Sequence, residues 1–174
     1  MGRLLISTAM TVDGVIEVTD WYVPGGEHSA AAFAVYDGVD AMLMGRKTYE
    51  GLAGYWPAQV GEWADLLNPL PKYVASRTLE GSLGWNAILL EGDVAEGVSR
   101  LKDELEGDLF LTGCGELARS LLDEGLIDEL VFWIHPVTAG PGPRPFESGS
   151  KSKLRLLESK AYGSGVTLLR YEPV

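Results

Sequence analysis

Six short apolar runs constrain the fold of this chain more than any other feature. Their hydrophobicity is nearly continuous instead of alternating with polar residues. This pattern is typical of strands covered on both faces, as in a largely parallel sheet. The runs are LLISTAM (4–10), AMLM (41–44), KYVAS (72–76), AILL (87–90), LFLT (109–112) and ELVFWIH (129–135).

Amphipathic stretches between these runs predict helices. Residues 94–105 and 117–122 both carry apolar side chains at helical spacing, and Gly125 marks the end of the second helix. The end of the chain differs, because 154–162 and 166–172 form two strand-like runs around a Gly-Ser-Gly turn. We therefore expect a single α/β domain over residues 1–174, with a mostly parallel central sheet flanked by helices and an antiparallel C-terminal hairpin.

Composition excludes several classes of function. The formal charge of −11 disfavours nucleic acid and anionic lipid as partners, because both require a basic surface. One cysteine excludes an internal disulfide, and the two histidines have no zinc-site spacing, so we expect no metal. The amino terminus shows no signal-peptide core, and no apolar run approaches the ~20 residues of a membrane span. A cytoplasmic location is the expectation.

Three predicted strands end in residues suited to phosphate. In an α/β sheet, ligands collect at the carboxyl ends of the strands, where N–H groups of the following helices point outward. Two clusters of cation and hydroxyl with a glycine turn suit a dinucleotide that carries an extra ribose phosphate, so they point to NADPH rather than NADH. The clusters are Gly45-Arg46-Lys47-Thr48, Ser76-Arg77-Thr78 and Thr112-Gly113-Cys114-Gly115-Glu116.

Each cluster alone has a simpler interpretation. An arginine after a strand is often a solvated surface residue, and Gly-x-Gly often marks only a tight turn. GCGELA (113–118) also fits the dinucleotide fingerprint of a Rossmann fold. It follows a late strand, however, and no acidic residue ends a strand about 20 positions later. We therefore favour a nucleotide-binding fold of another kind.

Several ordered motifs, taken together, carry a resemblance over essentially the whole chain. The chain resembles the dihydrofolate reductase superfamily, and most closely the reductase domain of bacterial riboflavin biosynthesis, the RibD C-terminal domain. The motifs are STAMTVDGVIE (7–17), MLMGRKTYE (42–50), VASRTL (74–79) and LTGCGELARSLLDEGLIDELVFWIHPVTAGPGPRPF (111–146).

This resemblance implies a role for each cluster at the strand ends. By this resemblance, the phosphates of NADPH would contact Gly45, Arg46, Lys47 and Thr48, and its 2′-phosphate would contact Ser76 and Arg77. The nicotinamide would contact Ala9 and Ile16. The pyrophosphate would lie against the turn and helix start formed by Thr112, Gly113, Cys114, Gly115, Glu116 and Leu117. The turn departs from the family at two positions. Cys114 replaces the commoner glycine, and Glu116 stands where a neutral or basic residue would suit phosphate better, so pyrophosphate affinity could be reduced.

The substrate end is less well defined. The carboxylate with which true dihydrofolate reductases bind folate is not clearly present, because the corresponding position falls near Ser29. Asp13 and Glu27 are the candidate catalytic acids, although the first is also a typical turn former and the second a typical residue for a helix start. Trp21 and Tyr22 could stack on a flat substrate or fill the core.

Several other residues have structural interpretations. Cys114 could be a reactive thiol near a helix start, but small filler in a tight turn is the simpler reading. His135 is expected to be a core or interface histidine. Lys72, Lys151 and Lys153 are expected to be solvated.

The sequence thus predicts an NADPH-dependent reductase that delivers hydride to a pterin- or pyrimidine-like heterocycle of riboflavin or folate metabolism. Asp13 or Glu27 would orient or protonate that substrate. The alternative is a nucleotide- or flavin-binding module without turnover. The resemblance also implies a homodimer that pairs through the C-terminal strands.

Overall fold

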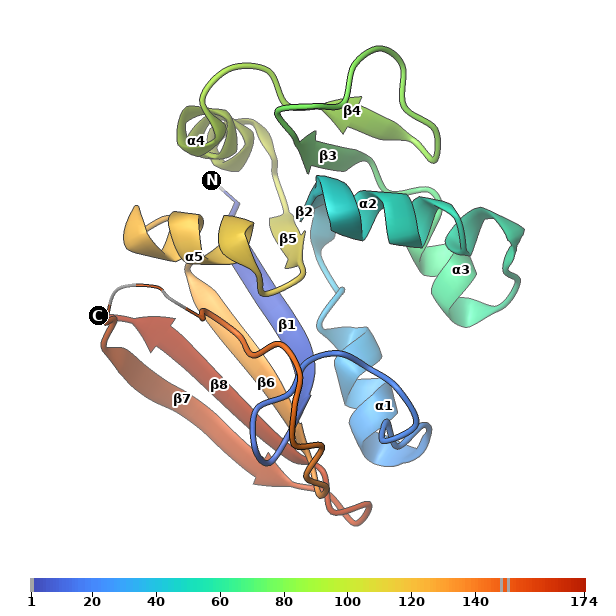
Figure 1. Cartoon of the computed structure of the whole chain (residues 1–174), viewed down its shortest axis with the longest axis vertical. Coiled ribbons are helices and arrows are strands. Elements are labelled where there is room, and N and C mark those ends of the chain that lie inside the picture. Colours follow the sequence, from blue (N-terminus) through green and yellow to red (C-terminus); the bar gives the residue numbers. More distant parts are fainter. Residues whose placement is uncertain (1, 148, 150) are drawn as a thin grey trace.

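The computed structural model describes residues 2–147, 149 and 151–174. One eight-stranded sheet runs through the molecule in the order β4-β3-β2-β5-β1-β6-β8-β7 (Figure 1). The strands are β1 (Leu4–Thr11), β2 (Val39–Gly45), β3 (Lys72–Ala75), β4 (Ala87–Leu89), β5 (Asp108–Thr112), β6 (Glu129–His135), β7 (Leu154–Ala161) and β8 (Thr167–Pro173). The helices are α1 (Gly26–Ala34), α2 (Arg46–Ala53), α3 (Glu62–Leu67), α4 (Val94–Glu104) and α5 (Glu116–Asp123), with a 3₁₀ turn at Trp56–Ala58.

The first six strands are parallel to one another, and the last two form an antiparallel hairpin at one edge. The turn of this hairpin contains Gly165 at φ +86°, a backbone conformation that favours glycine. Both the mostly parallel sheet and its antiparallel finish confirm the architecture expected from the sequence.

Successive side chains of a strand point to opposite faces of the sheet and so pack into two separate halves of the core. In β2, Leu43 packs with residues of α4 and α5 on one face, whereas Met42 and Met44 pack with α2 and α3 on the other. On that second face, α1 covers β6 through Val131 and Trp133. Helices on both faces bury most side chains of β2, β5 and the first half of β1, which explains why their sequences read as continuous apolar runs.

Lys72 corrects one expectation, because it is fully buried and not solvated. Its Nζ donates hydrogen bonds to the carbonyl oxygens of Leu67 (2.6 Å) and Asn68 (2.9 Å) at the end of α3, and it lies 4.2 Å from the centre of the Trp85 ring. Burial lowers the pKa of Lys72 to about 8. Lys151 and Lys153 are exposed, as expected.

No helix in the described ranges has the length and apolar character that a membrane span requires.

Candidate cofactor and substrate site

The carboxyl ends of β2, β3 and β5 lie side by side. Gly45 pairs with Ala75, and Met44 with Thr112, so the three strands end at nearly the same level. A Cβ atom placed on Gly113 would lie only 3.1 Å from the Thr48 hydroxyl oxygen, which shows how closely the turn after β5 approaches α2. The clusters predicted separately from the sequence therefore form one continuous edge.

Two helices begin at this edge without a side-chain cap. Gly45 and Gly115 are the N-cap residues of α2 and α5, and neither helix start donates a backbone N–H hydrogen bond to a capping side chain. The nearby start of α4 differs, because the Asp93 carboxylate accepts a hydrogen bond from the Glu96 N–H at 3.0 Å. Added Cβ atoms at Gly45 and Gly115 would meet no other atom within 4 Å. Both helix starts therefore have free N–H groups and the room that a phosphate requires.

Cations surround this edge. Lys47 and Arg77 are exposed, and neither forms an ion pair with any other residue that the structure describes. Arg46 reaches Glu50 on the next turn of α2 at 3.3 Å, an exposed contact that contributes little stability. The Ser76 hydroxyl accepts hydrogen bonds from two N–H groups of its own loop, which holds the backbone next to Arg77 in a tight turn.

The turn after β5 combines a buried thiol with a free hydroxyl. Cys114 is 2% exposed, and burial raises the pKa of its thiol to about 11, so it serves as core filler and not as a nucleophile. Gly113 has φ +96°, a conformation that side chains rarely adopt. The Thr112 hydroxyl oxygen is buried and finds no hydrogen-bond partner among the described residues. Leu117 packs into the core, and Glu116 occupies the first position of α5.

Asp13 has a structural task that the sequence could not show. Its carboxylate accepts hydrogen bonds from the Thr11 hydroxyl (2.6 Å) and from the N–H groups of Ala139 (3.0 Å) and Gly140 (2.8 Å). These bonds lower the pKa of Asp13 to about 2, and the carboxyl group therefore stays ionised at neutral pH. Asp13 thus ties the loop after β1 to the loop after β6, and this arrangement disfavours it as a proton donor.

The other substrate-end candidates are separated by the fold. Glu27 is exposed in the first turn of α1. Trp21 is buried, donates a hydrogen bond to the Glu17 carbonyl oxygen at 2.8 Å and packs edge-on against His135, an arrangement that fits core filler better than a stacking platform. Tyr22 is 37% exposed and lies beside the same imidazole ring.

A buried histidine pair lies at this end of the molecule, and sequence reasoning identified only one member. The rings of His28 and His135 are 5.9 Å apart, and both bond to the backbone of Val23. The Ser164 hydroxyl lies 3.0 Å from His28 Nδ1. Burial, and then the nearby His28, lowers the pKa of His135. Both rings are thus held in the core, which agrees with the structural role expected for His135.

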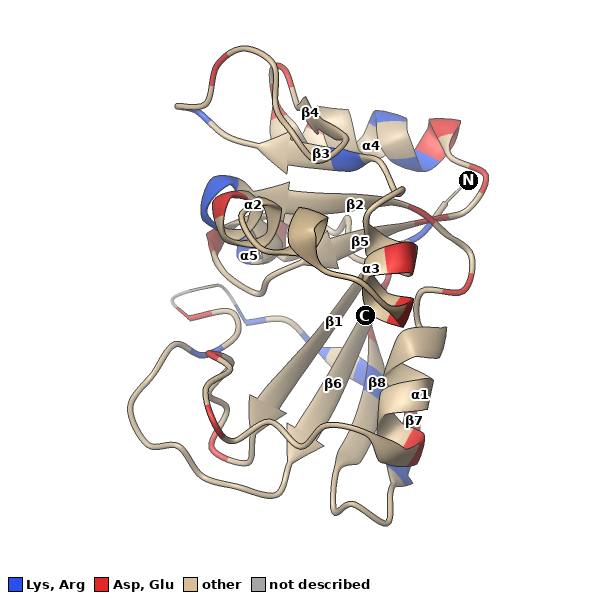
Figure 2. Ribbon diagram, turned by 90° about the vertical axis from the view of Figure 1, so that its right-hand side faces the viewer, with Lys and Arg blue, Asp and Glu red and all other residues tan. Residues whose placement is uncertain are grey.

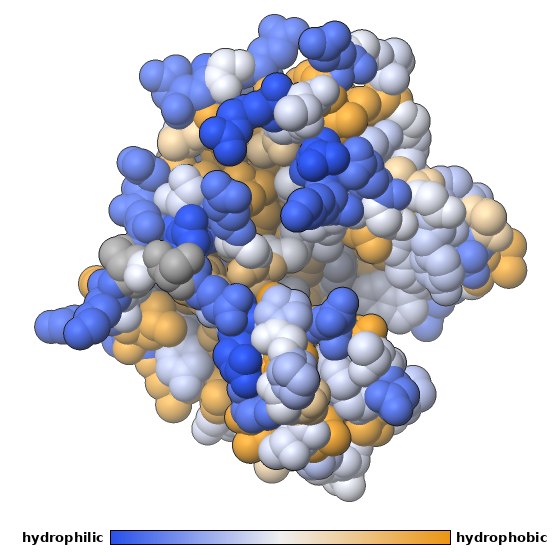
Figure 3. Space-filling model, viewed as in Figure 1, coloured by the Kyte–Doolittle hydropathy of each residue, from blue (hydrophilic) through white to orange (hydrophobic). Residues whose placement is uncertain are grey.

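Ala9 and Ile16, expected at the nicotinamide, pack into different parts of the core. Ala9 contacts the cluster under α1, whereas Ile16 packs against the cluster on the α4 and α5 face. The surface is visibly hollowed between the upper part of the molecule, which contains α2 and β3, and the lower part, which contains the loops after β1 and β6 (Figure 3).

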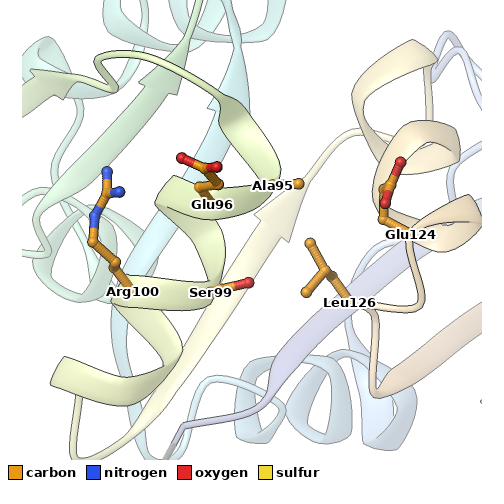
Figure 4. Close-up of a pocket in the computed structure, with 6 residues that line it drawn as sticks. All are labelled: Ala95, Glu96, Ser99, Arg100, Glu124 and Leu126. Atoms are coloured by element: carbon orange, nitrogen blue, oxygen red, sulfur yellow. The ribbon is translucent and has the colours of Figure 1, made fainter.

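A shallow hollow of about 500 Å³ lies elsewhere, between α4 and the end of α5 (Figure 4). None of the residues predicted for the site lines it; its walls are Ala95, Glu96, Ser99, Arg100, Glu124 and Leu126. A second cavity of about 330 Å³ lies between α1 and the C-terminal hairpin, where the buried Glu129 pairs with Arg3 and Arg170. We assign neither cavity to the cofactor.

The mostly parallel sheet with its antiparallel finish is a dihydrofolate-reductase-like fold. Residues 3–168 match the RibD C-terminal domain family, and the chain belongs to that family. It is 28% identical to the uncharacterized protein YyaP of Bacillus subtilis strain 168, over 97% of this chain and 94% of that protein.

Solved structures share the fold. A putative riboflavin biosynthesis protein from Shewanella sp. PV-4 aligns with a TM-score of 0.79 and 23% identity over 99% of both chains. A deaminase/5-amino-6-(5-phosphoribosylamino)uracil reductase from Thermotoga maritima aligns with a TM-score of 0.71 and 13% identity, over 99% of this chain and 57% of that one. Dihydrofolate reductase from Enterococcus faecalis, in complex with NADP(H), aligns with a TM-score of 0.65 and 16% identity, over 99% of this chain and 96% of that one.

Proposed function

We propose that the protein is an NADPH-dependent reductase that transfers hydride to a pterin- or pyrimidine-like heterocycle. The observation that carries the proposal is the meeting of two uncapped helix starts, at Gly45 and Gly115, with the exposed cations Lys47 and Arg77. The RibD C-terminal family, which is a reductase domain, and the fold shared with a dihydrofolate reductase in complex with NADP(H) support it.

Each group at this edge would have a distinct task. Backbone N–H groups of α2 and α5 would hold phosphate oxygens, and Arg77 would form a two-pronged contact with the 2′-phosphate. NADPH, when bound, supplies the hydride. Asp13 keeps the two loops beside the reacting centre together. Glu27, exposed to solvent, remains the acid that could orient or protonate the substrate through water.

One observation favours a second function, a nucleotide- or flavin-binding module without turnover. Among the described residues near the site, Asp13 stays ionised and Cys114 stays protonated at neutral pH, and the histidines are buried. None of these groups is therefore a positioned proton donor, and only the exposed Glu27 remains as a candidate. Incubation with NADPH and candidate pterins or pyrimidines, followed at the absorbance band of the reduced nicotinamide, separates the two functions. Consumption of NADPH supports the reductase, and tight binding without consumption supports the module.

We further propose a cytoplasmic homodimer in which β7 of one copy pairs with β7 of a second copy. All eight residues of β7 are exposed, including the apolar Leu154 and Leu156, and no other strand in the described part of the chain pairs with its outer edge. Glu158 and Lys160 alternate along it, so an antiparallel copy could place opposite charges together. Leu156→Lys should convert the dimer to a monomer in sedimentation experiments, whereas Val60→Lys, at a residue 95% exposed, should not. A wild-type monomer at all concentrations would contradict the proposal.

A further inference from the structure

The segment that joins β1 to α1 has few attachments to the rest of the molecule. No backbone-to-backbone hydrogen bond in the described ranges involves residues 17–24. The segment is held instead by the rings of Trp21 and Tyr22, which contact the imidazole of His135, and by Val23. The side chain of Val23 packs against the core under α1, and its backbone bonds to both histidines of the chain. The closed position of this segment therefore depends on those histidines.

Two buried imidazoles bind opposite sides of one residue. The Val23 N–H donates to Nδ1 of His135 at 3.2 Å, and the Val23 carbonyl oxygen lies 2.8 Å from Nε2 of His28. His28 is 2% exposed and His135 is 1% exposed. Ser164, in the turn of the C-terminal hairpin, lies 3.0 Å from Nδ1 of His28. The pair thus joins the loop after β1, the start of α1, the end of β6 and the hairpin turn, which lie at one end of the molecule (Figure 1).

The partners of each ring decide which ring nitrogens carry protons. A peptide N–H can only donate, so Nδ1 of His135 must be bare and this ring must be neutral. A proton on that nitrogen would place two donors 3.2 Å apart and break the bond. A carbonyl oxygen only accepts, so Nε2 of His28 carries a proton. Nδ1 of His28 faces the Ser164 hydroxyl, which can donate or accept, so His28 keeps both contacts in either charge state.

The groups packed around His135 do not favour a positive charge on it. They are Thr11 of β1, the rings of Trp21 and Tyr22, and His28 of α1. The hairpin adds Tyr162, whose ring contacts His28, and the cation of Lys160 over that ring.

The carboxylates of the loop and of α1 do not compensate. The charged residues in 12–34 are all acidic (Figure 2), and they are Asp13, Glu17, Asp20 and Glu27. None of them forms an ion pair with either imidazole in the described part of the chain. The carboxylate of Asp13 is bound instead to Thr11, Ala139 and Gly140. A positive charge on His135 would therefore be buried without a counter-ion.

These surroundings set the sign of the pH effect. Burial, and then the nearby His28, lowers the pKa of His135 below its usual 6.5. Because the folded-state pKa lies below the unfolded value, the closed arrangement is fully stable above about pH 6.5 and loses stability as the pH falls. Opening takes up one proton, so the opening constant can rise by up to about tenfold per pH unit.

We propose that His135 is an acid-sensitive latch: its protonation breaks the bond to the Val23 N–H and opens residues 17–22, while His28 keeps its bond to the Val23 carbonyl oxygen. This inference does not depend on the proposed function, because none of these contacts belongs to the phosphate-suited strand ends. Trp21 and Tyr22 leave the imidazole together when the latch opens.

Nitrogen-15 NMR of the two imidazoles tests the latch directly. The chain has only two histidines, so the spectrum of His28→Gln assigns both rings. At about pH 7.5 we expect a bare Nδ1 in His135 and a proton on Nε2 of His28, and His135 should titrate below about pH 6.5. A proton on Nδ1 of His135 at the higher pH, or a ring that stays neutral until the whole protein unfolds, overturns the inference.

Amide hydrogen exchange measures the opening itself. The protection of the Val23 N–H, corrected for the intrinsic pH dependence of exchange, should fall about tenfold between about pH 7 and 4.5. The Leu105 N–H, which donates to the Leu101 carbonyl oxygen at the end of α4, should keep its protection over the same range. Unchanged protection of Val23, or an equal loss at both amides, overturns the inference.

Two matched variants separate the histidines. His135→Asn keeps an acceptor near the position of Nδ1 but cannot titrate, so the protection of Val23 should hardly change with pH. His28→Gln keeps a donor for the Val23 carbonyl oxygen and removes the neighbouring ring, so the pH dependence should remain and its midpoint should rise. Wild-type pH dependence in His135→Asn, or its loss in His28→Gln, overturns the assignment to His135. Should His135→Asn fail to fold, the titration of the wild-type ring decides.

Discussion

Removal of Arg77 is the sharpest test of the cofactor assignment. The side chain is exposed and forms no ion pair within the described part of the chain, so its loss leaves no buried group without a partner. The fold should therefore tolerate Arg77→Ala, and only binding should change. One charge-assisted hydrogen bond to a phosphate contributes about 1.5–3 kcal/mol. This corresponds to a roughly 10- to 150-fold weaker Kd for NADPH.

Calorimetric titration with NADPH and with NADH measures this effect. Because NADH lacks the 2′-phosphate, its affinity should hardly change in Arg77→Ala. Arg77→Lys should be intermediate, since an ammonium keeps the charge but loses the two-pronged geometry. Lys153→Ala removes an equal charge near the end of β8, at the opposite edge of the sheet, and should bind like the wild type. Equal losses for both coenzymes in Arg77→Ala would refute the 2′-phosphate assignment.

Three further predictions follow from the strand-end geometry. Gly113→Ala should destabilise the protein by about 1–2 kcal/mol and weaken NADPH binding, because its φ is +96° and the Thr48 hydroxyl is close. The control, Gly92→Ala, lies at φ +78° with open space around it. It should lower the free energy of unfolding in denaturant through backbone strain but leave the affinity for NADPH unchanged. Glu116→Gln should tighten NADPH and NADH equally, by about two- to fivefold, since it removes a negative charge from the start of α5; unchanged calorimetric affinities would argue against a pyrophosphate there. Asp13→Asn should lower the unfolding temperature above about pH 4, and the deficit should shrink as the pH falls towards 2, because the folded-state pKa of Asp13 lies below its unfolded value; a deficit independent of pH would contradict the ionised carboxylate.

Much of the fold could be predicted because its signals are local. The six apolar runs became the six parallel strands, and Gly125 ends α5 as expected. The strand-end clusters were also recognisable, since a glycine and a cation directly after a strand must lie at its carboxyl end.

Other features depended on partners far away in sequence and had no local signal. Asp13 accepts hydrogen bonds from residues 126 and 127 positions later in the chain. Its local turn sequence therefore could not show whether it is a catalytic acid or a residue that holds two loops together. Lys72 was expected to be a surface charge because the two carbonyl oxygens and the indole ring that surround it belong to other segments of the chain. Trp21 could be interpreted in two ways until its contact with His135 was known.

The sequence by itself determined which segments are strands and which of their ends are rich in glycine, cations and hydroxyls, since hydrophobic periodicity and side-chain chemistry act over a few neighbouring residues. Only the tertiary structure decided that β2, β3 and β5 lie next to one another and that α1, α2 and α3 gather on one face. Strand order and helix packing arise from burial between distant segments, and that burial is a property of the whole folded chain.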